Sequence, residues 1–545
     1  MYITRIKNNN KNPKTNTCTL LRESYREKKV VKTRTIANLS HLSEIEIQAL
    51  EYALKNKEDI FKILNKKSVD KIYKSIGAVY LINQILKKLG IMNALGKGLN
   101  GKLAMLQIIS RVINQGSCLS TIRNTSQQSL CEVLKIKEKI NEDSLYENLS
   151  WLSQEQSEIE LKIFKNRYKE SAPTLYLYDV TSSYFEGTMN AMGMFGYNRD
   201  KKQGKMQVVA GLLCDDNGYP LSIELFNGNT LDYKTLESQI LKVAERFKCK
   251  NVVFVGDRGM IKEKQIASIT EQDFYYITAI TKPQVQKLLK DEVFEMSLFD
   301  TELKEVEYNR IRYILKRNPK RAMEMRRSRQ QKEEALTKFV KGRNEYLSQH
   351  QRAKVLTAIN KTEEKLKKLK LENYLTICKT SEDSRELEIV INESALAELT
   401  LLDGCYVIKT NLPLDVPKEK VHEHYKDLSK VERAFRNMKT DMLELRPWYV
   451  RKEESTRGHA FVVMLAYSVV KYLEVAWKDI GMPIKEGISA LNNISLIEQT
   501  FKNGDKEYVI PEPNKEMQKL LELAGVELPN KYQVIPINVV SNKIK

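Results

Sequence analysis

Apolar residues follow two different periods along this chain, and the change between them divides it. In short stretches at residues 2–6, 17–23 and 30–36 they alternate with polar residues, which predicts a small β unit with a hairpin between the last two stretches. From Ser43 they recur every three to four residues, Glu46 completes a capping box, and the helical pattern continues to about residue 161. A β unit therefore precedes a mainly helical region.

Two short helical stripes meet at Gly90, and two structures are compatible with them. Leu81 and Leu86 precede the glycine, and Ile91 and Leu95 follow it. Two short helices around such a turn are typical of a helix-turn-helix that binds DNA. An ordinary helical hairpin gives the same pattern and is the more frequent case, so both interpretations stay open at this point.

From Asp179 onwards the period changes to two, and two buried strands each lead to an aspartate. The apolar and aromatic run Leu175–Tyr178 is followed by Asp179, and the run Val252–Val255 is followed by Gly256 and Asp257. A carboxylate at the end of a buried strand is costly unless a cation or strong donors lie nearby. A turn explains a single aspartate equally well, but two strands of this kind favour a shared site.

The elements around these aspartates follow a recognisable order. Asn217-Gly218 joins two apolar runs in a predicted hairpin, a helix follows at residues 236–247, and a further strand is expected at residues 274–280. This order resembles a ribonuclease-H-like core, a mixed sheet flanked by helices, in which Asp179 and Asp257 lie on neighbouring strands. Two carboxylates placed side by side repel each other unless a divalent cation lies between them.

A third carboxylate, Glu432, lies at the centre of a predicted helical face. Residues 425–439 contain no proline or glycine. The residues spaced three or four apart on this face are Tyr425, Leu428, Glu432, Arg436 and Lys439. An ordinary surface Glu–Arg pair has the same spacing, and only the two aspartate strands favour a functional interpretation.

Residues 290–400 do not continue the sheet pattern, and their first part is strongly basic. Between Arg310 and Lys332 the chain has ten Lys or Arg residues and one acid, Glu324, which gives a net charge of +9. Solvated helix faces usually carry charges of both signs, so a one-sided block favours phosphate contacts. The candidates for these contacts are Arg326, Arg327 and Arg329. The whole chain of 545 residues carries +20, which favours nucleic acid over a membrane surface as its partner.

Composition argues against several other classes of protein. The seven cysteines form no CxxC pair, so neither a zinc knuckle nor a disulfide framework is indicated. The N-terminus has no signal-peptide core. The longest apolar run, Ala460–Val470, is shorter than the roughly 20 residues of a membrane span. We therefore expect a soluble, cytoplasmic protein without a membrane partner.

Taken together, these motifs resemble the DDE transposases of insertion sequences, in the insertion-sequence-four-like group. The signature of that group, Tyr-x2-Arg-x3-Glu-x6-Lys, reads Tyr425-x2-Leu428-x3-Glu432-x6-Lys439 here. Leucine replaces the arginine, and Arg433 or Arg436 could compensate for it. Further similar segments are Asp179-Val-Thr, Gly228-Asn-Thr, Gly256-Asp-Arg-Gly259, Glu444-Leu-Arg-Pro447 and Arg457-Gly-His459, and the long interval between Asp257 and Glu432 also fits the group.

The resemblance implies an enzyme that binds the terminal inverted repeats of a mobile element, cleaves phosphodiester bonds and joins the 3′-OH ends to target DNA. Asp179, Asp257 and Glu432 would be the catalytic residues and would bind two Mg²⁺ ions, with Mn²⁺ as a substitute. The residues implied in DNA contacts are Tyr425, Arg436, Lys439 and Arg258, beside the three arginines named above. His422 and His424 are not expected to be ligands, because Mg²⁺ prefers oxygen.

The resemblance also completes the expected organisation. The expected parts are a β unit with helices at 1–100 that binds DNA ends, a helical connection at 101–170, core segments at 171–290 and 401–475, a basic insertion subdomain at 291–400, and a C-terminal tail at 476–545. A homodimer in the synaptic complex and a bacterial-type, nucleoid-associated location are implied. Two alternatives remain, a ribonuclease-H-like nuclease that never joins strands and an inactivated transposase that only binds DNA; the intact triad argues against the second.

Overall fold

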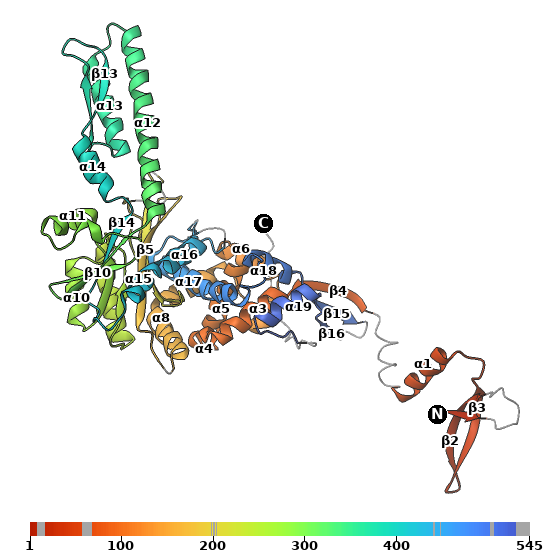
Figure 1. Ribbon diagram of the computed structural model, residues 1–545. Coiled ribbons are helices and arrows are strands. Elements are labelled where there is room, and N and C mark those ends of the chain that lie inside the picture. The colour runs from red at the N-terminus through yellow and green to blue at the C-terminus, as the bar shows by residue number, and fades with distance from the viewer. Residues whose placement is uncertain are drawn as a thin grey trace.

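The computed structural model describes residues 1–7, 17–56, 68–169, 171–197, 199, 202, 204–439, 442–446, 448–501 and 506–529. In Figure 1 these residues form a central body, a long helical arm and a small N-terminal β unit. The arm and the β unit stand out from the body at opposite ends of the view.

The N-terminal β unit is an antiparallel three-stranded sheet with one helix. Its elements are β1 (Tyr2–Lys7), β2 (Thr17–Glu27), β3 (Val30–Asn38) and α1 (Glu44–Lys55). The predicted hairpin and capping box are confirmed, since the Ser43 N–H donates 2.7 Å to the Glu46 carboxylate and the Glu46 N–H donates back to the Ser43 hydroxyl. The local pattern was sufficient here because both features involve near neighbours in the sequence.

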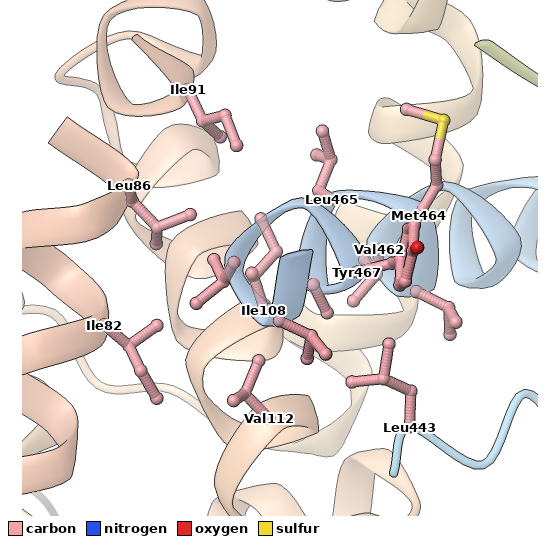
Figure 2. Close-up of a cluster of buried hydrophobic side chains, with 14 of the residues drawn as sticks. Ile82, Leu86, Ile91, Ile108, Val112, Leu443, Val462, Met464, Leu465 and Tyr467 are labelled. Carbon is pink, nitrogen blue, oxygen red and sulfur yellow. The ribbon is translucent and has the colours of Figure 1, made fainter. Parts of the chain in front are cut away.

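The helical part of the body is built around one long apolar helix, α17 (Glu453–Ala476). Three helices pack against it, α3 (Gly77–Lys88), α5 (Leu99–Ile113) and α8 (Glu142–Arg167). The shorter helices α4 (Ile91–Leu95), α6 (Cys118–Asn124) and α7 (Leu130–Leu134) pack against these three. In Figure 2, Val462 and Leu465 of α17 belong to one buried cluster with Ile108 of α5 and Ile82 of α3. Helix α3 buries eight of its twelve residues, and α4, the helix after Gly90, has only five residues, three of which are buried. The pair around Gly90 is therefore a packed helical hairpin.

Helix α17 is longer than the apolar run suggested. Its 24 residues are long and apolar enough to cross a membrane by length and composition alone, which differs from the expectation drawn from Ala460–Val470. In the structure, however, 72% of its most apolar window is buried, as in the core helix of a soluble protein. It is the only helix of this kind among the described residues.

An eight-stranded mixed sheet forms the other half of the body, in the order β10-β11-β14-β9-β8-β5-β6-β7. Its strands are β5 (Leu175–Tyr184), β6 (Gln207–Asp215), β7 (Pro220–Asn227), β8 (Val253–Val255), β9 (Tyr275–Ala279), β10 (Lys304–Tyr308), β11 (Ile311–Arg317) and β14 (Cys405–Thr410). Strands β5, β6 and β7 form an antiparallel meander, and β8 and β9 run parallel to β5. This is the ribonuclease-H-like arrangement that the element order predicted.

Helices cover both faces of this sheet, which explains why β5 is apolar at successive positions. Leu175 and Leu177 pack into the cluster that contains α17, whereas Tyr176 and Tyr178 pack into the cluster on the opposite face. The elements on that opposite face are α9 (Asp232–Leu241), the π-helix Lys242–Arg246 and α10 (Glu263–Glu271). Helix α11 (Lys282–Lys290) and the 3₁₀ turn Met296–Leu298 follow β9.

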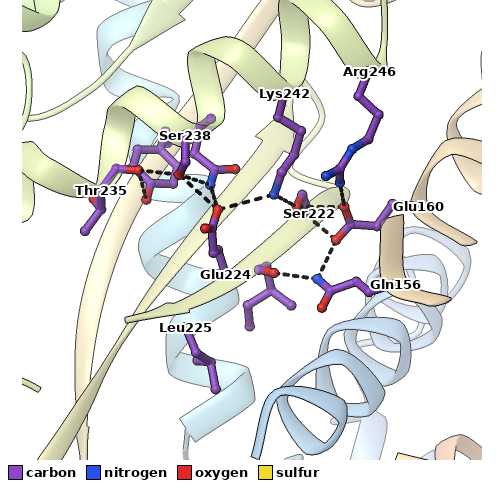
Figure 3. Close-up of polar contacts among 12 residues, drawn as sticks. Gln156, Glu160, Ser222, Glu224, Leu225, Thr235, Ser238, Lys242 and Arg246 are labelled. Atoms are coloured by element: carbon purple, nitrogen blue, oxygen red, sulfur yellow. Dashed lines mark hydrogen bonds and ion pairs between the residues drawn. The ribbon is translucent and has the colours of Figure 1, made fainter. Parts of the chain in front are cut away.

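The outer strand β7 is fixed to its neighbours by a buried polar network, shown in Figure 3. The Glu160 carboxylate of α8 accepts hydrogen bonds from Arg246 at 2.9 Å and from the hydroxyl of Ser222 on β7 at 2.9 Å. Glu224, two residues further along β7, accepts a hydrogen bond from Ser238 at 2.9 Å and lies 3.5 Å from Lys242. Because each of these carboxylates has donors, the network holds the strand in place without leaving an unpaired buried charge.

Two expectations about the second half of the chain were wrong. Strands β10 and β11 belong to the main sheet, although residues 290–400 were not expected to continue it. The apolar pattern of β11 is interrupted by Arg312, a charged residue at a buried position of the strand. Arg312 is only 3% exposed, because Glu305 and three backbone carbonyls accept its hydrogen bonds. The arm therefore starts only after β11. It consists of α12 (Pro319–Gln349), α13 (Val355–Leu369), β12 (Leu375–Lys379), β13 (Leu387–Ile391) and α14 (Glu393–Leu401).

The expected C-terminal tail is likewise part of the body. Its elements are α18 (Ile484–Asn492), β15 (Ser495–Phe501), β16 (Lys506–Val509) and α19 (Lys515–Leu523). Strand β15 pairs with β4 (Ser68–Ser75), so Ser75 lies opposite Ser495. No pattern within one segment of the sequence indicates a pairing between strands so far apart in the chain.

Candidate active site

The two aspartates come together because of the register between β5 and β8. Leu177 lies opposite Val255 in the parallel pair, so Asp179 and Asp257 each follow two residues later at the same edge. Strand β8 ends there, whereas β5 continues to Tyr184, so Asp179 lies within its strand and not at its end as expected. Backbone N–H groups orient both carboxylates, from Val180 at 2.8 Å and from Arg258 at 2.7 Å.

Glu432 reaches the same edge from α16 (Leu428–Lys439). The apolar stripe of this helix, which includes Val431 and Phe435, is buried in the core, and the glutamate on the other side stays exposed. The continuous helix predicted for residues 425–439 is wrong, because α15 (Lys418–Lys426) ends at Asp427 before α16 begins. Tyr425 therefore lies on a different helix from Glu432.

Asp179, Asp257 and Glu432 line one cavity of about 980 Å³. Its lining contains both apolar and charged side chains, and most of the charged ones are basic. Its charged lining residues are Asp179, Asp232, Asp257 and Glu432 on the acidic side and Arg199, Arg258, Lys282, Arg321, Lys426, Arg436 and Lys439 on the basic side. A second cavity of similar volume, about 990 Å³, lies in the arm between α12 and β13 and contains none of the three carboxylates.

The electrostatics of the site depend on Asp179. Burial raises the pKa of its carboxyl group to about 7, and the negative charges of Asp257 and Glu432 add to this rise, against the opposing effects of the Val180 N–H and Arg199. A carboxyl group in this state binds a proton or a cation readily. Three carboxylates offer the oxygen donors that a hard divalent cation prefers. Among the described residues, however, no three His, Cys, Asp or Glu side chains already stand close enough to hold one ion.

Four of the seven residues expected to contact DNA line this cavity. They are Tyr425, Arg258, Arg436 and Lys439. Leu428, which replaces the arginine of the signature, also lines it. Of the two arginines expected to compensate, Arg436 belongs to the lining and Arg433 does not. The break at Asp427 thus leaves the residues of the signature around a common space.

The other three, Arg326, Arg327 and Arg329 on α12, do not line the cavity. Arg326 and Arg327 are exposed on the arm. Arg329 donates two hydrogen bonds of 2.9 Å to Asp403, its side chain is 11% exposed, and the Asp403 side chain is fully buried. This buried pair fixes the base of the arm to the body, which argues against a phosphate contact for Arg329.

Sequence reasoning missed several residues of the lining. The side chain of Arg199 forms an ion pair with Asp232 inside the cavity. The backbone N–H of Arg199 donates a hydrogen bond of 2.9 Å to the Ser182 hydroxyl of β5. Lys282 enters from α11 and Arg321 from the first turn of α12. Two of these residues had a signal in the sequence, since Asp232 lies two residues after the Gly228-Asn-Thr motif and Arg321 belongs to the basic block Arg310–Lys332. Arg199 and Lys282 come from segments whose placement depends on the fold.

The two histidines near the site lie outside the cavity lining. The Tyr406 hydroxyl and Nε2 of His422 are 2.6 Å apart, and burial lowers the pKa of His422 to about 4. His424 is half-buried, with Nδ1 at 4.0 Å from the Asp427 carboxylate.

Comparison with known proteins places the chain in a family. Residues 170–469, more than half of the chain, match the family model described as transposase DDE domain, so the chain belongs to the DDE-domain transposases. Residues 3–66 match the N-terminal domain of IS1634 family transposases. Both matches confirm the insertion-sequence DDE transposase that the motifs resembled, a DNA transposase.

Two further comparisons add little. A search of curated proteins found no match. Among solved structures, the cryo-EM structure of the piggyBac transposase synaptic complex with hairpin DNA is similar over 77% of this chain and 69% of that chain, with 8% sequence identity and a TM-score of 0.35. A score this low carries no argument about the present chain.

Proposed function

We propose that this transposase cleaves DNA at the ends of its element and joins the resulting 3′-OH groups to target DNA at a metal-dependent site formed by Asp179, Asp257 and Glu432. The observation that carries the proposal is the shared cavity. Three carboxylates from β5, the turn after β8 and α16 line one space, although 175 residues separate Asp257 from Glu432.

Each carboxylate has a defined part in this proposal. The three together would hold two Mg²⁺ ions, or Mn²⁺ in their place, which when bound activate the attacking oxygen and stabilise the leaving oxygen. The Val180 and Arg258 N–H groups keep the carboxylates of Asp179 and Asp257 directed. Burial disfavours the charged form of Asp179, and a nearby cation favours it. Asp179 would therefore release its proton when a cation binds.

The basic lining would bind the DNA strand. Arg258 follows Asp257 directly, and Arg436 and Lys439 lie on the same helix as Glu432, so these cations line the same cavity as the carboxylates. Such groups hold phosphates and thereby position the scissile bond. Two copies of the chain, one for each end of the element, would form the synaptic complex.

A plasmid assay tests the proposal. The substrate is a supercoiled plasmid that carries both ends of the element, incubated with Mg²⁺ or Mn²⁺. Glu432→Gln keeps the size of the side chain but removes its charge, so nicking should fall by about 100-fold or more, the scale of losing one electrostatic contact to a transition state. Asp179→Asn and Asp257→Asn should have the same effect, and EDTA should abolish the reaction of the wild-type chain.

The matched control is Glu419→Gln on α15, an exposed glutamate outside the cavity lining. It should nick at the wild-type rate. DNA binding by Glu432→Gln should persist or become tighter, because one negative charge leaves a site that faces phosphates. Wild-type nicking by Glu432→Gln would show that the third ligand lies elsewhere.

A further inference from the structure

The N-terminal sheet has two faces of different chemistry, which the register between β2 and β3 defines. The pairs Arg22↔Thr35, Ser24↔Thr33 and Arg26↔Val31 stand on one face, called the open face here. The pairs Glu23↔Arg34, Tyr25↔Lys32 and Glu27↔Val30 stand on the other, called the paired face.

The paired face neutralises its own charges. Arg34 lies 2.7 Å from Glu23 and Lys32 lies 2.7 Å from Glu27, and the guanidinium group of Arg34 also stacks over the Tyr25 ring at 5.6 Å. Each cation of this face therefore has a carboxylate beside it. Little positive charge is left there for an external partner.

Helix α1 lies on the side of the paired face. Arg5 of β1 stands opposite Thr19, which shares its side of β2 with Glu23. Ion pairs of 2.7 and 3.4 Å join Arg5 to Glu44 and Glu51 of α1. The helix and the ion pairs thus belong to one side of the sheet, and the open face is left uncovered by α1.

The open face carries cations without acids. None of its six residues is acidic, and Arg22 and Arg26 form no ion pair with another of the described residues. Ser24, Thr33 and Thr35 add hydroxyl groups, and Val31 is 61% exposed. At the tip of the hairpin, Lys28 and Lys29 are exposed and both have positive φ, as a tight turn requires.

This set of groups matches what a DNA groove offers. Arginine binds the O6 and N7 acceptors of guanine, hydroxyl groups donate to or accept from several bases, and an exposed aliphatic side chain contacts the methyl group of thymine. A two-stranded ribbon fits the major groove, which is about 12 Å wide. The lysines at the tip would then lie near a phosphate backbone.

We propose that the open face of the β2–β3 ribbon enters the major groove at the ends of the element and distinguishes that sequence from other DNA. The proposal rests on the transposase function and assigns end recognition to a sheet. The helical pair around Gly90 is the other candidate for end recognition in the sequence, but its second helix, α4, has only five residues, and three of them are buried.

Binding measurements on the full-length chain test this inference. Fluorescence anisotropy in EDTA, where no cleavage occurs, compares a duplex carrying the end of the element with a scrambled duplex of equal composition. The double variant Arg22→Gln/Arg26→Gln should lose about ten-fold or more of the preference for the end. The matched control Lys32→Gln/Arg34→Gln removes the same number of positive charges from the paired face and should keep the preference.

The outcomes separate this inference from the proposed function. An unchanged preference in the Arg22/Arg26 variant, or an equal loss in both double variants, would overturn the role of the open face. In either case, a wild-type chain that still nicks the plasmid keeps the transposase mechanism intact. As a check on folding, the Arg22/Arg26 variant should bind the scrambled duplex at low salt as the control variant does, and it should nick a plasmid at saturating protein.

Discussion

Two arginine-rich segments of this chain look alike in sequence and differ in structure. The stretch Arg310–Lys332 has the higher density of positive charge, yet Arg312 and Arg329 are buried and hold the fold together. The β2–β3 ribbon carries fewer cations, and Arg22 and Arg26 remain without an ion-pair partner among the described residues.

The difference follows from where acceptors are placed. Next to β11, the chain supplies carbonyl oxygens at 412, 413 and 416 and the Glu305 carboxylate, so the guanidinium group of Arg312 makes four hydrogen bonds inside the protein, out of the five that it can donate. On the open face, the neighbours across the strands are hydroxyl groups and a valine. Charge density in the sequence therefore does not show which arginines are available to DNA; the cross-strand and tertiary neighbours decide it.

The largest effect should come from Arg312→Ala. The substitution removes a buried cation and leaves Glu305 and three carbonyls without their donor, so the free energy of unfolding should fall by about 4–5 kcal/mol. Denaturant unfolding measures it. Arg326→Ala on exposed α12 should change the same quantity by less than about 0.5 kcal/mol, and equal effects of the two changes would break the comparison.

A somewhat smaller loss is expected from Asp403→Asn. Arg329 would lose its charged partner at the base of the arm, which should lower the free energy of unfolding by about 3 kcal/mol. Glu324→Gln, which breaks the exposed pair with Arg321, should cost less than about 1 kcal/mol. If Asp403→Asn is as stable as the wild type, Arg329 does not fix the arm and its role in phosphate binding is open again.

The exposed arginines of the arm should act on DNA binding and not on stability. Arg326→Gln/Arg327→Gln should reduce the slope of log affinity against log salt by about 1.8, since each phosphate contact contributes about 0.9. Over a four-fold rise in salt concentration, the variant should therefore lose about ten-fold less affinity for DNA than the wild-type chain loses. An unchanged slope, measured by titration at several salt concentrations, would place these arginines on a solvated surface.

The smallest effect is the pH dependence of metal affinity and of stability that Asp179 causes. Because the pKa of Asp179 is raised to about 7, a metal ion must displace its proton below that pH. Mn²⁺ should bind about ten-fold more tightly one pH unit above this pKa than one unit below it, as calorimetry can measure. In the metal-free protein the linkage has the opposite sign. The folded state binds the proton more strongly than the unfolded one, so stability falls as pH rises from about 4 to 7.

Asp179→Asn provides the comparison for both pH effects. This variant has no carboxyl group to titrate at the position, so its residual Mn²⁺ affinity and its metal-free stability should lose that pH dependence. Equal Mn²⁺ affinity of the wild-type chain on both sides of the pKa would contradict the buried, protonated state of Asp179.

Local patterns in the sequence were sufficient for a large part of the fold and the site. The N-terminal hairpin, the hairpin at Asn217-Gly218 and the two aspartate strands depend on residues near one another in the chain, and each was predicted. The element order then placed Asp179 beside Asp257. The three carboxylates do line one cavity, although their catalytic role remains a prediction.

The features that the sequence did not predict depend on contacts between distant parts of the chain. Strand β11 carries an inward arginine, which periodicity counts as a polar break. The boundary between α15 and α16 at Asp427 contains neither proline nor glycine, the residues that usually indicate the end of a helix. Pairing of β4 with β15 joins segments more than 400 residues apart, and Lys282 and Arg321 reach the cavity only through the placement of α11 and α12.

Joining of a pre-cut end tests the central claim most directly. A duplex that ends in the 3′-OH of the element is incubated with the chain, Mg²⁺ and a supercoiled plasmid, and covalent joining of the labelled strand to the plasmid is measured on a denaturing gel. We expect joined product from the wild-type chain, none with a 3′-dideoxy end, and a loss of about 100-fold or more for Glu432→Gln. Nicking of the plasmid without joining would identify a nuclease, and joining by Glu432→Gln at the wild-type rate would contradict the proposed triad.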